Sequence, residues 1–521
     1  MTLRPAFLRL SVFLGVVVWL GLGICEEAIA RAGGAGGRRS SKSSSRSSGS
    51  SYRSSKSNGS SSHRSKSSGS YRSSGGSSYR SSGGGSSYGY YSGSGSGTHW
   101  LEWVIWSVAG GAPVLLGVIL IHRYWKAHKP EPVVHPQPPA PVGREAFLAA
   151  NPDFDPGLFV AKVRSAFMKI QRAWTVQDIS QIRPFISDGM YQRFATQFRM
   201  MGLLKQRNVL DKIKVFGVHP IAFRNDGAFD VIDVWIYASM SDSFTCGLDP
   251  SMNSEGNDPF VEYWSFIRKR GAVDSGFNLF AAETCPSCGA ELPQDMGELC
   301  RCSHCQVLVN SGEFDWVLAE ITQEGDYGGR TLLGARVPLD LPADVAAIAP
   351  ECPDFSRQLL EDKASNAFMQ IMTSWATRNP ASVRRFSTDE VFAGISEFIS
   401  SPPDIAFARI YLNEAVLLHV TRDAAQAKHR IDVGLSASMQ RVELFPDGRF
   451  RPLDWEEKRS YFSLSMERDI DAVPEKGSLY QHQCATCGGR VGDTIDVTCQ
   501  YCGSALNSTR NEWIVCGFRE S

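Results

Sequence analysis

The chain carries one cysteine arrangement twice, and this duplication constrains its fold more than any other feature. Each copy contains two Cys-x-x-Cys pairs: Cys285 and Cys288 with Cys302 and Cys305, then Cys484 and Cys487 with Cys499 and Cys502. In both copies a tryptophan stands eleven residues after the last cysteine, as Trp316 and Trp513. The sequence therefore predicts two related units, each containing a cysteine-rich segment.

Two Cys-x-x-Cys turns that face each other are typical of a structural zinc site. Each turn lets two thiolates converge on one metal ion, and four sulfur ligands leave no open position for water. The sequence therefore predicts two zinc ribbons, each with one structural zinc ion, and places Cys300 outside the first ligand set. A redox pair at Cys285 and Cys288 is one alternative, and ordinary buried thiols are another.

The first 99 residues predict a targeting signal followed by a low-complexity tail. Residues 1–30 combine two basic residues with an apolar run and a small-x-small site ending at Ala30, which is typical of a secretory signal peptide. An uncleaved signal anchor is the alternative. Residues 31–99 hold eleven Lys or Arg and no acidic residue. With so few apolar side chains we expect a disordered tail, either a spacer or a binder of anionic polymers or lipid headgroups.

Residues 100–122 predict a single transmembrane helix. Within it, the run from Leu101 to Ile121 is apolar apart from Glu102 and Ser107, and aromatic residues flank this run on both sides. Three basic residues follow it closely: Arg123, Lys126 and Lys129. The positive-inside rule then predicts a single-pass protein of a bacterial inner membrane with its C-terminal domains in the cytosol. A reducing cytosol also suits zinc-binding thiolates, and the proline-rich residues 123–145 predict a semi-rigid linker.

After the linker, helical and strand periodicities follow each other in order. Asp155 and Pro156 predict a helix N-terminus, apolar residues recur at helical spacing up to Trp174, and a second helix is expected near Ser187. The period then changes to two, which predicts a bent antiparallel sheet. The expected fold class is α+β, with helix-plus-sheet domains and ribbons at these residues: 146–275 and 280–325 in the first copy, 350–470 and 480–518 in the second.

Repeated residues support the duplication of the whole unit. Phe167, Ile170 and Trp174 recur as Phe368, Ile371 and Trp375; Ile232-Asp233-Val234 recurs as Ile431-Asp432-Val433; and Tyr263-Trp264-Ser265 is matched with Tyr461-Phe462-Ser463. The offset stays near two hundred throughout. Arg183 and Arg384 also correspond, and each is expected to cap a helix or to pair with a carboxylate.

Four features follow one another in this order: a membrane anchor, a proline-rich linker, a Phe-x-x-Ile-x-x-x-Trp helix, and a ribbon that continues into Gly312–Leu318. In these features the chain resembles bacterial proteins with Tim44-like domains. The resemblance covers residues 146–325 and, more loosely, the second copy. It implies two tandem cone-shaped domains of helices and antiparallel sheet, the fold of nuclear transport factor 2. It also implies a non-enzymatic tether or adaptor that contacts membrane or a partner polypeptide, as in protein transport or membrane assembly.

No catalytic residue is assigned. Asp233 and Asp432 stand where some enzymes of this fold place a base, but neither has a companion His or Tyr at matching positions. The best candidates for contacts with a partner are Trp235 and Tyr237, because alternation places them opposite the apolar face of their strand. The expected partner is a protein or peptide, with lipid as a further possibility.

Two other function classes stay open at this stage. Zinc ribbons often bind nucleic acid or ribosomes, but from Trp100 onward the chain has 41 basic against 52 acidic residues, and phosphate binding needs clustered Lys and Arg. We therefore expect no nucleic acid partner. The remaining alternative is a small-molecule enzyme built in one of the cones.

Overall fold

The computed structural model describes residues 119–120, 122–123, 135–272, 277–328, 331–472, 484, 486–492 and 494–521. The predicted signal peptide and tail lie outside these residues, as do most of the predicted membrane span and the first part of the linker. Among the helices of the described residues, none combines the length and the apolar composition that a bilayer crossing requires.

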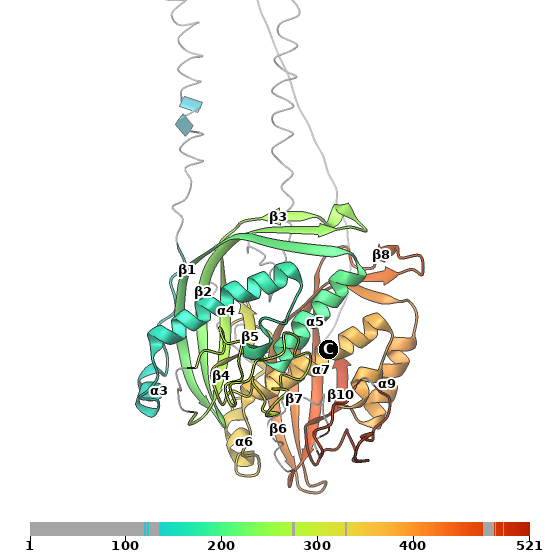
Figure 1. The fold of residues 1–521 in the computed structure, drawn as a ribbon. Coiled ribbons are helices and arrows are strands. Elements are labelled where there is room, and N and C mark those ends of the chain that lie inside the picture. Colours follow the sequence, from blue (N-terminus) through green and yellow to red (C-terminus); the bar gives the residue numbers. More distant parts are fainter. Residues whose placement is uncertain are drawn as a thin grey trace, which may run out of the picture. The chain divides into compact units, whose positions relative to one another are not determined.

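The first copy forms helices followed by a five-stranded antiparallel sheet (Figure 1). Its helices are α3 (Arg144–Ala150), α4 (Pro156–Val176), the 3-10 turn η1 (Arg183–Phe185) and α5 (Asp188–Leu203). Its strands are β1 (Gln206–Asp226), β2 (Phe229–Cys246), β3 (Ser254–Gly256), β4 (Phe260–Lys269) and β5 (Val317–Gln323), with the short turn η2 (Pro250–Met252) before β3. The strand order is β1-β2-β4-β5, and β3 pairs with β2.

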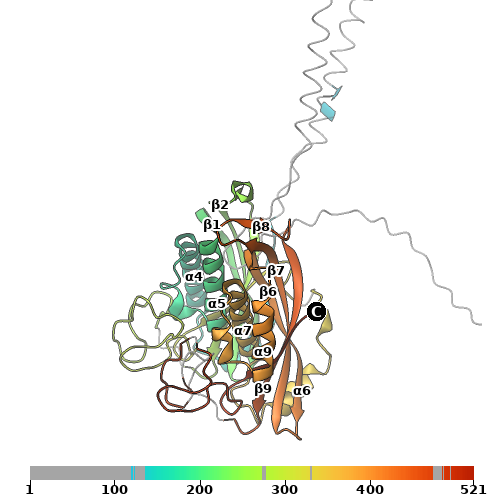
Figure 2. The same ribbon diagram turned by 90° about the vertical axis from the view of Figure 1, so that its right-hand side faces the viewer.

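The second copy repeats this topology after the turn η3 (Gly334–Arg336) and helix α6 (Leu341–Ile348). Its helices are α7 (Arg357–Thr377), α8 (Ala381–Arg384) and α9 (Asp389–Ser400), and its strands are β6 (Ile405–Asp423), β7 (Lys428–Leu444), β8 (Phe450–Pro452), β9 (Lys458–Asp469) and β10 (Ile514–Glu520). The order β10-β9-β7-β6, with β8 on β7, mirrors the first sheet. Figure 2 shows the strands of this sheet with α7 and α9 beside them. The expected mixed fold with two antiparallel sheets is thus confirmed.

Side-chain caps define the starts of the main helices. Asp155 accepts hydrogen bonds from the first backbone N–H groups of α4, and Pro156 takes the first helical position, as the sequence predicted. Ser187 caps α5 through the N–H of Met190. In the second copy Ser356 and Thr388 cap α7 and α9 in the same way. The caps therefore recur at the same offset as the helices.

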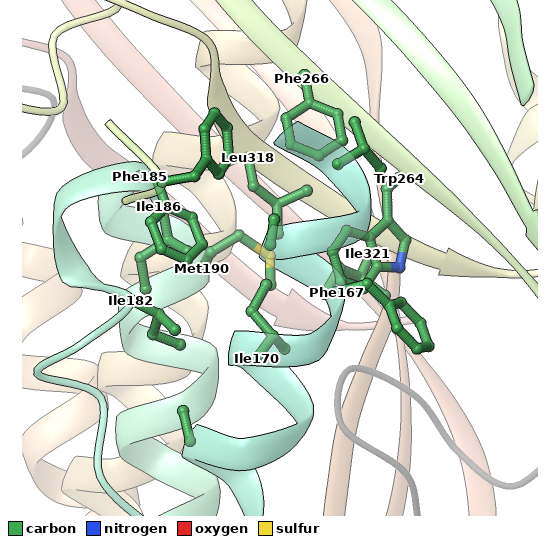
Figure 3. Packing of buried hydrophobic residues seen from close by; sticks show 14 of the residues in the cluster. Phe167, Ile170, Ile182, Phe185, Ile186, Met190, Trp264, Phe266, Leu318 and Ile321 are labelled. Carbon is green, nitrogen blue, oxygen red and sulfur yellow. The ribbon is translucent and has the colours of Figure 1, made fainter. Parts of the chain in front are cut away.

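The inner face of each sheet packs on the long helix of its own copy. In β2 the alternating side chains of Ile232, Val234 and Ile236 are buried in one hydrophobic cluster with α4. Figure 3 shows part of this core, where these side chains converge from helices and sheet: Phe167, Ile170, Met190, Trp264, Phe266, Leu318 and Ile321. Close-packed aromatic and aliphatic groups therefore fill the inside of the first cone.

The cysteine-rich segments are insertions between paired strands. The chain leaves the first sheet at Lys269 and returns at Val317 to pair β5 antiparallel with β4. In the second copy it leaves at Asp469 and returns at Ile514. Residues Val317–Gln323, which the sequence analysis assigned to the first ribbon, are therefore a strand of the sheet. Each ribbon lies within its domain because the closing strand follows it.

Strand register shows where the repeat alignment needs correction. Asp233 pairs with Ser265 across β2 and β4, whereas Asp432 pairs with Ser465 across β7 and β9. Tyr263-Trp264-Ser265 therefore corresponds to Ser463-Leu464-Ser465, two residues away from the match made on sequence similarity. The physical reason is that a shift of two residues preserves the face of every side chain, so alternation alone cannot detect it.

The two copies contact each other through α5 and α7. Ser187 Oγ donates to Asp362 Oδ1 at 2.5 Å, and the N–H of Gly189 donates to Asp362 Oδ2 at 3.1 Å. Burial raises the pKa of the Asp362 carboxyl to about 7, and these two hydrogen bonds act in the opposite direction. Asp226, at the end of β1, accepts hydrogen bonds from the N–H groups of Arg357 and Gln358 and so caps α7. Specific hydrogen bonds therefore join the two copies in addition to apolar packing.

The junction predicts opposite effects for two glycines of α5. A Cβ on Gly189 would lie 2.2 Å from Asp362 Oδ1, whereas a Cβ on Gly202 would meet nothing within 4 Å. We expect Gly189→Ala to lower the free energy of unfolding by about 1–3 kcal/mol through overpacking. Gly202→Ala should raise it by up to about 1 kcal/mol through helix propensity. Denaturant unfolding followed by tryptophan fluorescence would measure both, and equal effects would contradict the close approach of α5 to α7.

Candidate functional site

The eight cysteines of the Cys-x-x-Cys pairs come together as two four-sulfur clusters. The ligand sets are Cys285, Cys288, Cys302 and Cys305, and Cys484, Cys487, Cys499 and Cys502, and within each set the sulfur atoms lie within 4.8 Å of one another. Two S···S distances are 3.7 Å in the first cluster, and two are 3.6 Å in the second. A regular tetrahedron of four sulfur atoms about 2.3 Å from zinc has edges of about 3.8 Å. Each cluster therefore fits one tetrahedral metal ion of its own.

Backbone N–H groups lie close to the sulfur atoms of both clusters. The N–H groups of Ser287, His304 and Tyr501 each lie 3.4 Å from a ligand sulfur. The N–H of Cys305 is the main cause that lowers the pKa of the Cys302 thiol to about 6. Such donors favour the thiolate, which is the form that binds metal.

The residue after each Cys-x-x-Cys pair has a positive φ. Glycine takes this position three times, as Gly289, Gly488 and Gly503, with φ of 73–74°. In the remaining pair Gln306 has φ 62°, and its side chain donates to the Ser303 carbonyl. Glycine adopts this backbone conformation without steric cost, so its recurrence follows from the turn that brings two sulfur atoms together.

Cys300 lies outside the first cluster, as the sequence analysis placed it. Its thiol is fully buried and lies 3.6 Å from the Arg183 carbonyl oxygen. Burial raises the pKa of this thiol to about 11, although the nearby Arg183 guanidinium lowers it. Cys300 therefore helps to pack the ribbon against the helices.

Arg183 attaches the first ribbon to its cone. The buried guanidinium pairs with Asp188 at 2.6 Å and donates to the carbonyl oxygens of Gly297 and Glu298 in the ribbon. Asn310 adds hydrogen bonds to Asp188 and to the Ile186 carbonyl. The predicted pairing of Arg183 with a carboxylate is confirmed. Its contacts to the ribbon were not expected, because they depend on residues more than a hundred positions away.

The second copy repeats part of this attachment with fewer buried groups. Arg384 pairs with Asp389, as predicted, and Asn507 donates to the Ser387 carbonyl. In this pair the Asp389 carboxylate is largely exposed. The described part of the second ribbon has a small cluster of its own: Cys484, Val491, Cys499 and Leu506. Among the described residues, the second ribbon thus makes fewer buried polar contacts with its domain than the first.

Asp233 is engaged by three neighbours. Arg224 Nη1 lies 2.5 Å from Asp233 Oδ2, Ser265 Oγ donates to Oδ1 at 2.8 Å, and the Tyr327 hydroxyl donates to Oδ2 at 2.9 Å. Burial and the Asp233 charge raise the pKa of Tyr327 well above its usual range. Asp233 therefore has a Tyr neighbour in the first copy, although the sequence shows no His or Tyr at positions that match between the two copies. No local signal pointed to Tyr327, which lies 94 residues away and reaches Asp233 only through the tertiary fold.

Asp233 lines a polar cavity of about 430 Å³ at the junction of the two copies. Six carboxylates line it: Asp226, Asp233, Glu320, Asp326, Glu361 and Glu414. Arg224 and Arg357 reach the same cavity. Most of these carboxylates pair with arginine or cap a helix, so the cavity is a network of compensated charges.

Trp235 and Tyr237 lie on the face of β2 away from the core, where alternation placed them, but they are not exposed. Their side chains are 2% and 6% exposed, and they pack with Ile221, Val261 and Tyr263 in a separate cluster. The two rings are therefore buried in the structure, whereas the sequence analysis expected them to be open to a partner. Residues of the neighbouring strands cover the two rings. The alternation of side chains along one strand shows which face a residue lies on, but not whether other residues cover that face. A binding role for the two rings stays an untested prediction.

A groove of about 500 Å³ opens between α5 and the first ribbon. Its floor comes from Tyr191, Ala195 and Phe198, which follow one face of α5, and Ile179 adds a further apolar side chain. Asp178 and Asp295 stand exposed at its rim. The sequence analysis missed this site because its two walls, helix and ribbon, are separated by about a hundred residues.

Comparison with known families identifies one domain. Residues 142–284 match the Tim44-like domain. The match begins at Val142, which bridges to Ala222 of β1, and ends directly before Cys285. A comparison with curated proteins gives no match. The expected Tim44-like domain is thus confirmed for the first copy, and the second copy shares its topology by internal comparison.

The clusters predict the metal content of the protein. We expect two zinc ions per purified chain, one zinc ion after Cys288→Ser, and still two after Cys300→Ser, because Cys300 is not a ligand. Loss of a ligand should also lower the free energy of unfolding of that ribbon, since metal affinity is part of its folding free energy. Elemental analysis with thiol titration would measure this. Fewer than two zinc ions in the unsubstituted chain, or loss of one in Cys300→Ser, would contradict the assignment.

Proposed function

We propose that this protein is a non-enzymatic adaptor, anchored in a bacterial inner membrane by residues 100–122, whose two folded copies lie in the cytosol and bind a polypeptide. The Tim44-like match of residues 142–284 supports a role of this kind. The two zinc-bound ribbons have a structural role in it, since each four-sulfur cluster has no position left for a reacting water.

The observation that carries the proposal is the groove beside the first ribbon. Tyr191, Ala195 and Phe198 provide a half-buried apolar floor, and Asp178 and Asp295 provide an acidic rim. A concave apolar surface with a few charged groups at its edge suits the side chains of a short polypeptide segment. The acidic rim favours a segment with basic residues beside its apolar ones.

The state of Asp233 supports a binding role over an acid–base one. The Asp233 carboxylate already accepts hydrogen bonds from Arg224, Ser265 and Tyr327, so its oxygens are engaged within the protein and not left open to a substrate. The cone interior is filled by side chains of the core, so lipid acyl chains have less room there than in the groove. These features favour a polypeptide in the groove over a small-molecule substrate in the cone.

Site-specific photocrosslinking in native membranes tests the groove. A photoreactive residue at Ala195 should give a discrete polypeptide adduct, while the same residue at Arg199, an exposed position of α5 outside the groove, should not. Asp178→Lys with Asp295→Lys should reduce the adduct several-fold by reversing the rim charge. Equal adducts at both positions, or adducts with lipid alone, would refute polypeptide binding at this groove.

The proposed topology has a separate test. Reporter fusions at Gly97 and Pro141 lie on opposite sides of the predicted span. A reporter that works only in the periplasm should be active at Gly97 and inactive at Pro141, because Arg123, Lys126 and Lys129 favour retention of their side in the cytosol. Periplasmic activity at Pro141 would place the folded copies on the other side of the membrane.

A further inference from the structure

The contact between α5 and α7 provides a template for a second contact of the same kind. On α7, the face turned toward α5 carries Asp362, Ser365, Met369 and Thr373, which form hydrogen bonds with Ser187, Gly189, Arg193 or Thr196. This contact and the sheet behind it bury 17 of the 21 residues of α7. The helix is covered on nearly every side because α5 of the other copy lies against it.

Helix α4 is the counterpart of α7, and its equivalent face is uncovered. Both helices have 21 residues and begin and end 201 positions apart. The positions that correspond to the α5-facing residues of α7 are Ala161, Arg164, Met168 and Arg172, and all four are exposed. Met168 is 44% exposed whereas its counterpart Met369 is 0% exposed. Only 9 residues of α4 are buried, and its outer face has no described helix against it.

Helix α9 is the counterpart of α5 at the same offset, and its equivalent face is also uncovered. Glu390, Gly394 and Glu397 correspond to Gly189, Arg193 and Thr196, and they are exposed. Phe398 is 48% exposed beside them. A Cβ on Gly394 would meet nothing within 4 Å, so this side of α9 has room for a close neighbour.

The two uncovered faces are complementary in charge. Arg164, Lys169 and Arg172 lie on the outer side of α4, and none of them forms an ion pair with a described side chain. Glu390 and Glu397 on α9 likewise have no ion-pair partner among the described residues. Exposed apolar groups accompany the charges on both sides, with Met168 on α4 and Phe398 on α9. A basic apolar face and an acidic apolar face on one chain are expected to attract each other between molecules.

We propose that α9 of one molecule packs on α4 of a second copy of this chain, and so repeats between molecules the α5–α7 contact that joins the two copies within one molecule. In this arrangement Arg164 and Arg172 face Glu390 and Glu397, and Met168 meets Phe398. Gly394 allows a close approach at the position of Arg193. The occupant of the α4 face is thus the chain itself.

The contact is heterologous, which determines the kind of assembly. Each molecule brings one α4 face and one α9 face, and the two faces differ, so one contact leaves one face of each kind free. Repetition of such a contact produces an open row of molecules or a closed ring, and the smallest ring is a two-fold dimer with two such contacts. The groove at Ala195 is lined by none of the α4 or α9 residues of the proposed contact. Polypeptide binding in the groove and self-association can therefore be tested separately.

Charge reversal on each face, followed by mixing, tests the proposal with the purified full-length chain in detergent. One variant carries Arg164→Glu and Arg172→Glu, and the other carries Glu390→Arg and Glu397→Arg. Sedimentation at several concentrations should show association of the unsubstituted chain and at least about tenfold weaker association of each variant alone. An equimolar mixture of the two variants should associate again, because each reversed face then meets a face of opposite charge.

Three controls make the outcome decisive. Arg449→Glu, at an exposed position of the β7–β8 turn, should leave association unchanged. Unaltered zinc content and circular dichroism establish that the variants fold, and the rescue on mixing gives the same information independently. The proposal fails if the unsubstituted chain is monomeric at every concentration, if the variants associate as it does, or if mixing restores nothing. It also fails if Arg164→Glu with Arg172→Glu abolishes only binding to vesicles with anionic lipid, since the α4 face would then dock on a membrane.

Discussion

A buried ion pair between the long helix and a carboxylate two residues before the closing strand is common to both copies. Lys162 of α4 lies 2.8 Å from Asp315, and Lys363 of α7 lies 2.6 Å from Glu512. Each carboxylate also accepts the N–H of the following tryptophan, which leads into the last strand of the sheet. Removal of one partner would leave a buried charge uncompensated, at a cost of about 3–5 kcal/mol. The point at which the chain returns from the ribbon to the sheet therefore depends on this pair.

The pair explains how an insertion of more than forty residues can leave the sheet intact. β4 and β5 pair directly although the ribbon lies between them in the sequence. Four cysteine sulfur atoms converge within the ribbon, and the ion pair together with Trp316 holds its exit against α4, where the indole packs with Phe154 and Phe159. The four-sulfur cluster and the closing strand thus belong to one domain, and the ribbon is part of that domain.

The two copies share a topology but differ in what covers them. The α7 helix is buried between its own sheet and α5. Polar side chains such as Asp362 are tolerated on its α5-facing side because α5 supplies hydrogen-bond partners for them. The α4 helix carries arginine, lysine and methionine at the corresponding positions and exposes them. Within one molecule, the two copies form one contact, between α5 and α7. The equivalent faces of α4 and α9 are exposed, and they carry basic and acidic residues respectively.

The sequence by itself determined the duplication, the α+β class, the helix caps and the two four-cysteine sets, because each of these depends on short spacings that local geometry imposes. Only the tertiary structure decided that the ribbons are insertions and that Tyr327 reaches Asp233. It also decided that Trp235 and Tyr237 are covered, and that a groove forms beside Ala195. Those features depend on contacts between different elements of the chain, some of them about a hundred positions apart, and neither hydrophobic period nor motif spacing carries information about which other surface covers a given face. For the same reason α4 and α7 look alike in sequence pattern, and only the packing of α5 distinguishes the exposed helix from the buried one.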